Sequence, residues 1–143
     1  MTVQEQIRAN AELVVRQLGP TSGMEDFGYN ADSVSWVDGF VERQRLRSDM
    51  AEPEIDQLIQ NLACYVGECV RACYGGEWQR QDGSWAVTFD ASNAVFPFNK
   101  VRKQFENGAE DSIDSWFNTI PVVFAQLVQP QSSKKQKPWW KRL

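Results

Sequence analysis

Acidic side chains near the middle of the chain are the residues best suited to acid–base chemistry. Glu68, Glu77, Asp82 and Asp90 lie close together in sequence, around a predicted β-hairpin. Two carboxylates held about 5–9 Å apart in a cleft can act as acid and base or as acid and nucleophile, as in glycosidases. Sequence spacing does not set that distance. A carboxylate-based enzyme or small-ligand binder is therefore an alternative, and no catalytic residue is assigned.

Other catalytic and metal-binding patterns are missing from the sequence. The chain has no histidine, which excludes Ser-His-Asp and Cys-His arrangements. Gly75-Gly76 is too short a signal for a phosphate-binding loop. A zinc site would need cysteines and carboxylates alone, without the usual Cys-x-x-Cys spacing. We therefore expect a protein that acts through a surface, with no metal and no cofactor.

A mixed-charge group forms a candidate ligand-binding or structural polar site, made of Glu68, Arg71, Glu77 and Arg80. Glu68 and Arg71 share one face of a predicted helix. In the functional interpretation, the Glu68 carboxylate beside Gly67 contacts a partner or a ligand. In the structural interpretation, Glu68 pairs with Arg71 or caps the turn at Tyr74–Glu77. The structural interpretation is favoured, since buried acids usually have partners.

The last segment, residues 130–143, is predicted to be a flexible basic tail. Trp139 and Trp140 lie outside every apolar pattern, and Lys141 and Arg142 follow them. Because Trp and Arg are frequent hot-spot residues, these four residues are the predicted partner-binding site. One alternative is a peripheral membrane protein that docks through the tail, but each cation adds only about 1 kcal/mol near an anionic leaflet, so membrane contact would be weak. Another is a tail that folds onto its own domain or stays loose.

The charge of the tail is opposite to that of the rest of the chain. The sequence has 15 basic and 19 acidic residues, and five of the basic ones follow Pro130. Residues 1–129 therefore hold ten basic residues against nineteen acidic ones. This acidic body should repel phosphates, so we expect no binding to nucleic acid.

The cysteines and the N-terminus indicate the compartment. Cys64, Cys69 and Cys73 fall within one predicted helix and suit apolar packing better than a disulfide. The first residues lack the pattern of a secretory signal. We therefore expect a soluble cytoplasmic protein.

Helical spacing of apolar residues organises the first half of the chain. It predicts a helix over about residues 3–18, ended by Gly19-Pro20, and a loop over 21–31. A second helix over about 33–47 is predicted to bury Trp36, Val37, Phe40 and Val41. The third helix, 53–73, carries apolar residues on one face and Cys64, Gly67, Glu68 and Arg71 on the other. We expect this helix to be central, with contacts on both faces.

A hairpin follows the central helix. Asp82-Gly83 lies between two β-prone runs, which predicts a two-residue type I′ turn. Arg80 is then opposite Trp85, where a cation–π contact is expected. One face of the hairpin is predicted to cover the core, and the other, which includes Thr88, is predicted to be exposed.

The remaining pattern completes an α+β fold. A short strand over 94–96 precedes helices over about 98–107 and 112–120, and Pro121 is predicted to end or kink the last one. Residues 122–128 are apolar enough to be buried. The predicted fold has N-terminal helices and a central amphipathic helix packed on an antiparallel sheet of about three strands, followed by C-terminal helices. Residues 1–129 are predicted to form a single domain.

Short motifs in the middle of the chain resemble those of small bacterial domain families of unknown function. They are Gly67-Glu68 in a helix, Gly76-Glu77-Trp78 at a strand, Phe96-Pro97 at a strand end, and a basic helix from Lys100-Val101 to Glu106-Asn107-Gly108. The resemblance implies a bacterial source and an α+β fold, and it carries no activity. By analogy with small acidic immunity proteins, the leading hypothesis is a non-catalytic immunity- or adaptor-type module with an unidentified protein partner. A homodimer is also compatible with the sequence.

Overall fold

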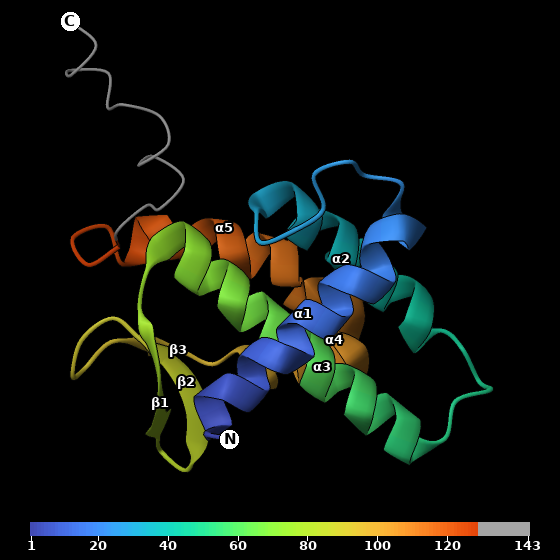
Figure 1. Cartoon of the computed structure of the whole chain (residues 1–143), viewed down its shortest axis with the longest axis horizontal. Helices are drawn as coiled ribbons and strands as arrows, with labels where there is room; N and C mark the ends of the chain where they lie inside the picture. The colour runs from blue at the N-terminus through green and yellow to red at the C-terminus, as the bar shows by residue number, and fades with distance from the viewer. Residues whose placement is uncertain (129–143) are drawn as a thin grey trace, which may run out of the picture.

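The computed structural model describes residues 1–128. Three helices come first: α1 (Val3–Ser22), α2 (Ala31–Arg45) and α3 (Glu52–Tyr74). The strands are β1 (Glu77–Gln81), β2 (Ser84–Thr88) and β3 (Ala94–Val95), and they precede α4 (Pro97–Asn107), a 3₁₀ turn (Gly108–Asp111) and α5 (Ile113–Val123). Figure 1 shows their arrangement, which confirms the predicted α+β class. The predictions made for residues 130–143 lie outside the described residues.

Helix α3 lies at the centre of the core, as its two-sided pattern predicted. Helix α1 crosses α3 and packs against it, and α4 packs against it from another side (Figure 1). Every residue from Leu62 to Gly67 is buried, so this part of α3 has no solvent-exposed face. Cys64, Cys69 and Cys73 are buried free thiols, which confirms that they pack as small apolar side chains.

The hairpin forms in the predicted register, with Arg80 opposite Trp85. Asp82 and Gly83 have φ values of 52° and 79°, the positive values that a type I′ turn requires. The sheet order is β1-β2-β3, so β2 is the central strand.

The sheet face predicted to be exposed is partly buried, which corrects the expectation for Thr88. Ala86 and Thr88 of β2 have exposed fractions of 0% and 7%. Both lie on the central strand, and Thr88 is flanked by Glu77 of β1 and Ala94 of β3. On the edge strand β1, Glu77 and Gln79 of the same face are exposed.

The prediction of a cation–π contact between Arg80 and Trp85 is wrong. The Arg80 guanidinium instead donates a hydrogen bond to the Gly83 carbonyl oxygen at 3.1 Å. This carbonyl belongs to the turn three residues ahead and is therefore within easy reach of the side chain. A cation–π contact does form elsewhere in residues 1–128, where Arg43 lies 5.4 Å from the Trp36 ring centroid.

Gly19-Pro20 do not end α1, which continues to Ser22. A proline in the last turn removes one N–H donor, and this costs less at the end of a helix than in its middle. The hydroxyls of Thr21 and Ser22 donate to carbonyl oxygens one turn earlier, at 3.3 and 2.7 Å. Gly23, with φ 71°, then ends the helix in the left-handed conformation.

Helix α2 begins at Ala31, earlier than predicted, because Asn30 caps it. The Asn30 side chain accepts a hydrogen bond from the Ser33 N–H at 2.8 Å. Val37 and Val41 are fully buried, as predicted, and Val34 is fully buried as well. Trp36 and Phe40 are only partly buried and stack with ring centroids 5.6 Å apart.

The end of α5 is exposed, whereas residues 122–128 were expected to be buried. Ile113, Phe117 and Ile120 form the buried stripe of the helix. Pro121 lies within α5 and does not end it, and the last turn continues past the core. Val122 and Val123 consequently have exposed fractions of 76% and 68%.

All three tyrosines of the chain are kept protonated by burial, which leads to a pH prediction. Burial raises the pKa of Tyr29 and Tyr74 to about 12, with a smaller contribution from Glu68 at Tyr29. Burial also raises the pKa of Tyr65, whose hydroxyl donates to the Gly28 carbonyl oxygen at 2.5 Å. In the unfolded chain the phenols ionise near pH 10. The folded state therefore has its full stability from these groups below about pH 10 and loses it as pH rises toward about 12.

An alkaline titration checks this prediction. Phenolate absorbance should rise near pH 12 instead of near pH 10, and the helical circular dichroism should weaken over the same pH range. Phenolate absorbance near the ordinary tyrosine pKa, with the helical signal intact, would contradict the raised pKa of these tyrosines.

Candidate functional site

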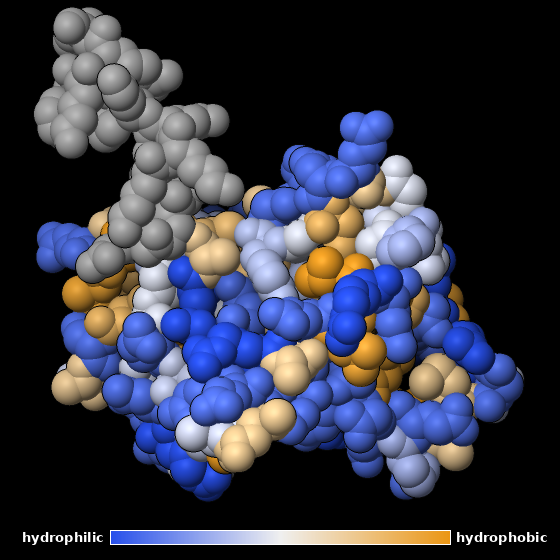
Figure 2. All heavy atoms as spheres, in the orientation of Figure 1, coloured by the Kyte–Doolittle hydropathy of each residue, from blue (hydrophilic) through white to orange (hydrophobic). Residues whose placement is uncertain are grey.

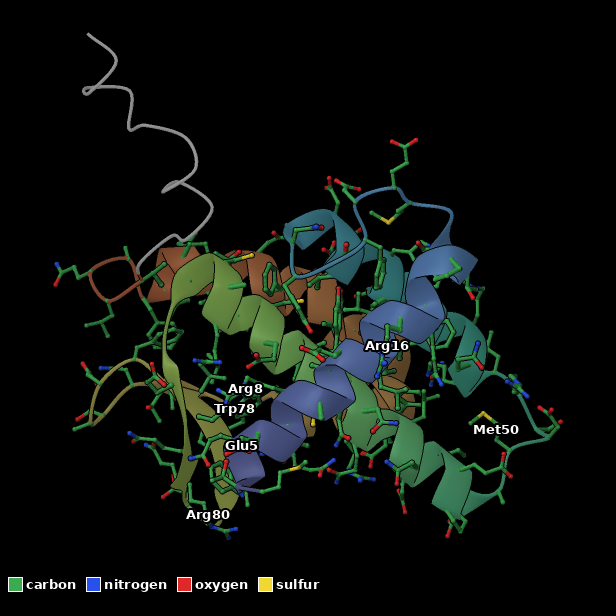
Figure 3. All side chains as sticks on the ribbon, viewed as in Figure 1. Glu5, Arg8, Arg16, Met50, Trp78 and Arg80 are labelled. Atoms are coloured by element: carbon green, nitrogen blue, oxygen red, sulfur yellow. The ribbon has the colours of Figure 1, made fainter. Side chains whose placement is uncertain are left out.

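Three of the four residues of the predicted polar site come together, and the fourth does not. Arg71 Nη1 lies 3.0 Å from Glu68 Oε2, and Arg71 Nη2 lies 3.6 Å from Glu77 Oε2. Arg71 Nε also donates to the Gly76 carbonyl oxygen at 3.2 Å. Arg80 lies at the turn end of the hairpin, away from this group (Figure 3).

The contacts of Glu68 show what this group does. Its Oε2 atom accepts a hydrogen bond from Trp78 Nε1 at 2.8 Å as well as the bond from Arg71. The Glu68 side chain is only 12% exposed, and these contacts are internal. The group therefore fixes the Trp78 indole against α3 and closes the turn into β1, in agreement with the structural interpretation.

The other acids considered for acid–base chemistry are also engaged or exposed. Asp90 accepts hydrogen bonds from the Ser92 and Asn93 N–H groups and from Asn93 Nδ2, all at 2.8 to 3.0 Å. These bonds hold the pKa of Asp90 below its ordinary value. Asp82 forms the tight turn of the hairpin. In the part of the chain that the structure describes, no three His, Cys, Asp or Glu side chains gather as metal ligands.

A second polar group, which the sequence analysis missed, joins α2, α4 and α5. Gln104 is fully buried. Its Nε2 donates to Asp38 Oδ1 and Glu42 Oε2, both at 3.1 Å, and its Oε1 accepts from the Ile113 N–H at 2.8 Å. Asp38 Oδ2 also accepts from Ser112 Oγ at 2.6 Å and from a backbone N–H of α5 at 2.9 Å. The only available signal was a glutamine three residues after Val101, on the buried side of a helix.

These bonds hold α4 and α5 side by side, and a groove of about 420 Å³ lies where the two helices meet β3. Its volume falls within the usual range of ligand-binding pockets. The apolar lining consists of Ala94, Val95, Phe96, Trp116, Ile120, Val123 and Phe124. The polar lining consists of Asn99, Lys100, Lys103 and Thr119. We refer to this site as the α4/α5 groove.

The groove continues into a second hollow of about 500 Å³. The two hollows share Val123 and Phe124, and Val122 lines the second one. Figure 2 shows hydrophobic surface at the side of the molecule where α5 ends. We refer to Val122 and Val123 as the valine pair. This surface was not predicted from the sequence, because the apolar residues 122–128 were expected to lie in the core.

Comparisons with protein-family models, with curated proteins and with solved structures find no match for this chain. They therefore add no family to the resemblance noted in the sequence. None of the helices in residues 1–128 is long and apolar enough to cross a membrane. The geometry itself defines the class: an α+β protein in which a polar network holds two helices around an open, mostly apolar groove.

Proposed function

We propose that this protein is a non-catalytic interaction module that binds a segment of a partner protein in the α4/α5 groove and over the valine pair. The observation that carries the proposal is the exposure of Val122 and Val123, at 76% and 68%, beside the two hollows. Contiguous apolar surface of this kind is typical of interaction sites.

The extent of the surface favours a protein segment over a small molecule. A small ligand held in the groove would leave Val122 and the second hollow uncovered, because Val122 lines only the second hollow. A chain segment can cover both hollows and the valine pair together. The Gln104 and Asp38 hydrogen bonds fix the groove walls before binding, which lowers the entropic cost of association.

The proposed setting is the bacterial cytoplasm, with an immunity- or adaptor-type role. Three free, buried thiols support a reducing compartment. The lack of a metal-ligand cluster in the described residues, together with the internal contacts of Glu68 and Asp90, favours binding over catalysis.

The double substitution Val122→Asp/Val123→Asp tests the proposal. Two charges placed on an apolar contact should weaken partner binding at least about 30-fold, equivalent to about 2 kcal/mol. The measurement is quantitative recovery of partners from bacterial lysate, with circular dichroism to confirm that each variant is folded. The matched control is Val3→Asp/Leu46→Asp, which changes exposed apolar residues outside the groove (48% and 77% exposed).

A partner that binds the valine variant as well as the wild type would overturn the proposal. Trp139→Ala/Trp140→Ala, made in the full chain, tests the partner-binding site predicted from the sequence. A partner lost only with this tail variant would assign binding to residues outside the groove.

A further inference from the structure

The basic residues of the described chain are arginines and lysines, and the lysines gather at the groove. Residues 1–128 contain eight arginines and two lysines. Both lysines, Lys100 and Lys103, line the α4/α5 groove, and its lining within residues 1–128 includes no acidic side chain. Acids outnumber basic residues by 19 to 10 in this part of the chain. The groove is therefore a local positive region on an acidic protein.

The two lysines have different surroundings. The Lys100 side chain is 15% exposed, and its Nζ lies 3.7 Å from Asp111 Oδ1. Asp111 Oδ2 accepts a hydrogen bond from Asn107 Nδ2 at 2.7 Å. This bond and the charges of both lysines hold the pKa of Asp111 below its ordinary value. Lys103 is exposed and forms no ion pair within 4.0 Å in the described residues.

Lys103 can therefore meet a carboxylate from outside the molecule at the same time as the apolar lining is covered. Trp116 and Ile120 line this groove, and Val123 continues the apolar surface toward the end of α5. A ligand that uses both properties has an acidic group at one end and apolar side chains at the other.

We infer that the partner segment carries an aspartate or glutamate next to aliphatic or aromatic side chains, with its carboxylate at Lys103 and its apolar side chains in the groove and over the valine pair. The inference rests on the proposed function and adds the chemistry of the partner to it. The net negative charge of residues 1–128 disfavours a carboxylate away from the two lysines, and Asp90 disfavours one in the second hollow. The lysines thereby select both the place and the direction of docking.

Selection of random peptides displayed on phage, with the full chain immobilised, tests the inference without a known partner. Peptides are sequenced before and after selection on the wild type, on Val122→Asp/Val123→Asp and on Lys103→Glu. Peptides that need the valine pair should be enriched in Asp or Glu beside Val, Leu, Ile, Phe or Trp. On Lys103→Glu this acidic preference should disappear or change to Lys and Arg.

Individual peptides then provide a measured affinity. A selected peptide, made synthetically, should bind Lys103→Gln about 5–10-fold more weakly than the wild type, and its affinity should fall as salt increases. The matched control is Arg102→Gln, which removes the same charge from the neighbouring residue, outside the groove lining. This control should leave the affinity unchanged within about twofold.

The failures of the two proposals are distinguishable. Valine-dependent peptides without acidic enrichment would overturn the inference and leave the proposed function in place. If every selected peptide binds the valine variant as well as the wild type, or if none is selected, both proposals are overturned. Equal loss of affinity in Lys103→Gln and Arg102→Gln would show that net charge acts without docking at Lys103, which also overturns the inference.

Discussion

Replacing Gly67 with alanine should lower the free energy of unfolding by about 3 kcal/mol or more, because the site is already filled. A Cβ atom at this position of α3 would lie 2.1 Å from the Cη2 and Cζ2 atoms of Trp78 and 3.3 Å from Pro97 Cγ. The indole cannot move away freely, since it is 3% exposed and donates to Glu68. Alanine favours a helix by about 1 kcal/mol over glycine, so the clash itself should cost about 1 kcal/mol more than the measured loss.

Urea denaturation followed by circular dichroism measures this effect, and Gly39→Ala is the matched control. Gly39 is also helical, and a Cβ atom there would lie 3.3 Å from the flexible end of the Arg43 side chain. Gly39→Ala should therefore be neutral or stabilising by up to about 1 kcal/mol. Adding Trp78→Leu should make Gly67→Ala less costly than it is in the wild type. A fully stable Gly67→Ala protein would refute this packing of Trp78 on α3.

Gln104→Leu should cost about 3 kcal/mol, because it leaves polar groups of two other helices without a partner. The leucine cannot accept from the Ile113 N–H, which Gln104 Oε1 does at 2.8 Å. It also removes the donor that lies 3.1 Å from both Asp38 Oδ1 and Glu42 Oε2. Glu42 then loses this donor, whereas Asp38 keeps its bonds from Ser112 Oγ and the Asp114 N–H.

The control for size and hydrophobicity is Gln60→Leu, at an exposed position of α3, where the change should stay within about 0.5 kcal/mol. Gln104→Glu adds a pH-dependent test. Burial beside Asp38 and Glu42 should raise the pKa of the new carboxyl in the folded state. Its cost relative to the wild type should therefore grow as pH rises above about 4, where the unfolded carboxyl ionises. A cost that does not vary with pH would contradict the contact with these acids.

Much of the fold was predictable because its signals are local. Asp82-Gly83 suit the two positive φ values of the turn, and this fixes the hairpin register. The small residue at position 67 indicated that another element packs on the second face of α3. The burial of Thr88 was not predictable in the same way, since it follows from the position of β2 between two strands. The continuation of α1 through Pro20 depends on hydroxyl bonds that no periodicity reveals.

The two polar groups and the groove also differ in whether local sequence signals predict them. The contact of Glu68 with Arg71 follows from helical spacing, and the contact of Arg71 with Glu77 follows from the short turn between α3 and β1. The α4/α5 groove is built from residues of three elements. The apolar run after Pro121 predicted burial, whereas Val122 and Val123 are exposed. The hydrogen-bond network of Gln104 was still harder to predict from the sequence, because Asp38 lies 66 residues away in the chain.

The two ends of α5 are held unequally. Hydrogen bonds to Asp38 and Gln104 fix its first turn, whereas Pro121 has no N–H to donate within the last turn. Local opening should therefore require little free energy near Val123 and much more near Ile113. The surface proposed for binding thus combines a rigid first turn of α5 with a last turn that opens more easily. A partner that orders the last turn of α5 would lose part of its binding free energy in doing so. Its residence time would depend on the stability of this turn as well as on the contacts that it makes.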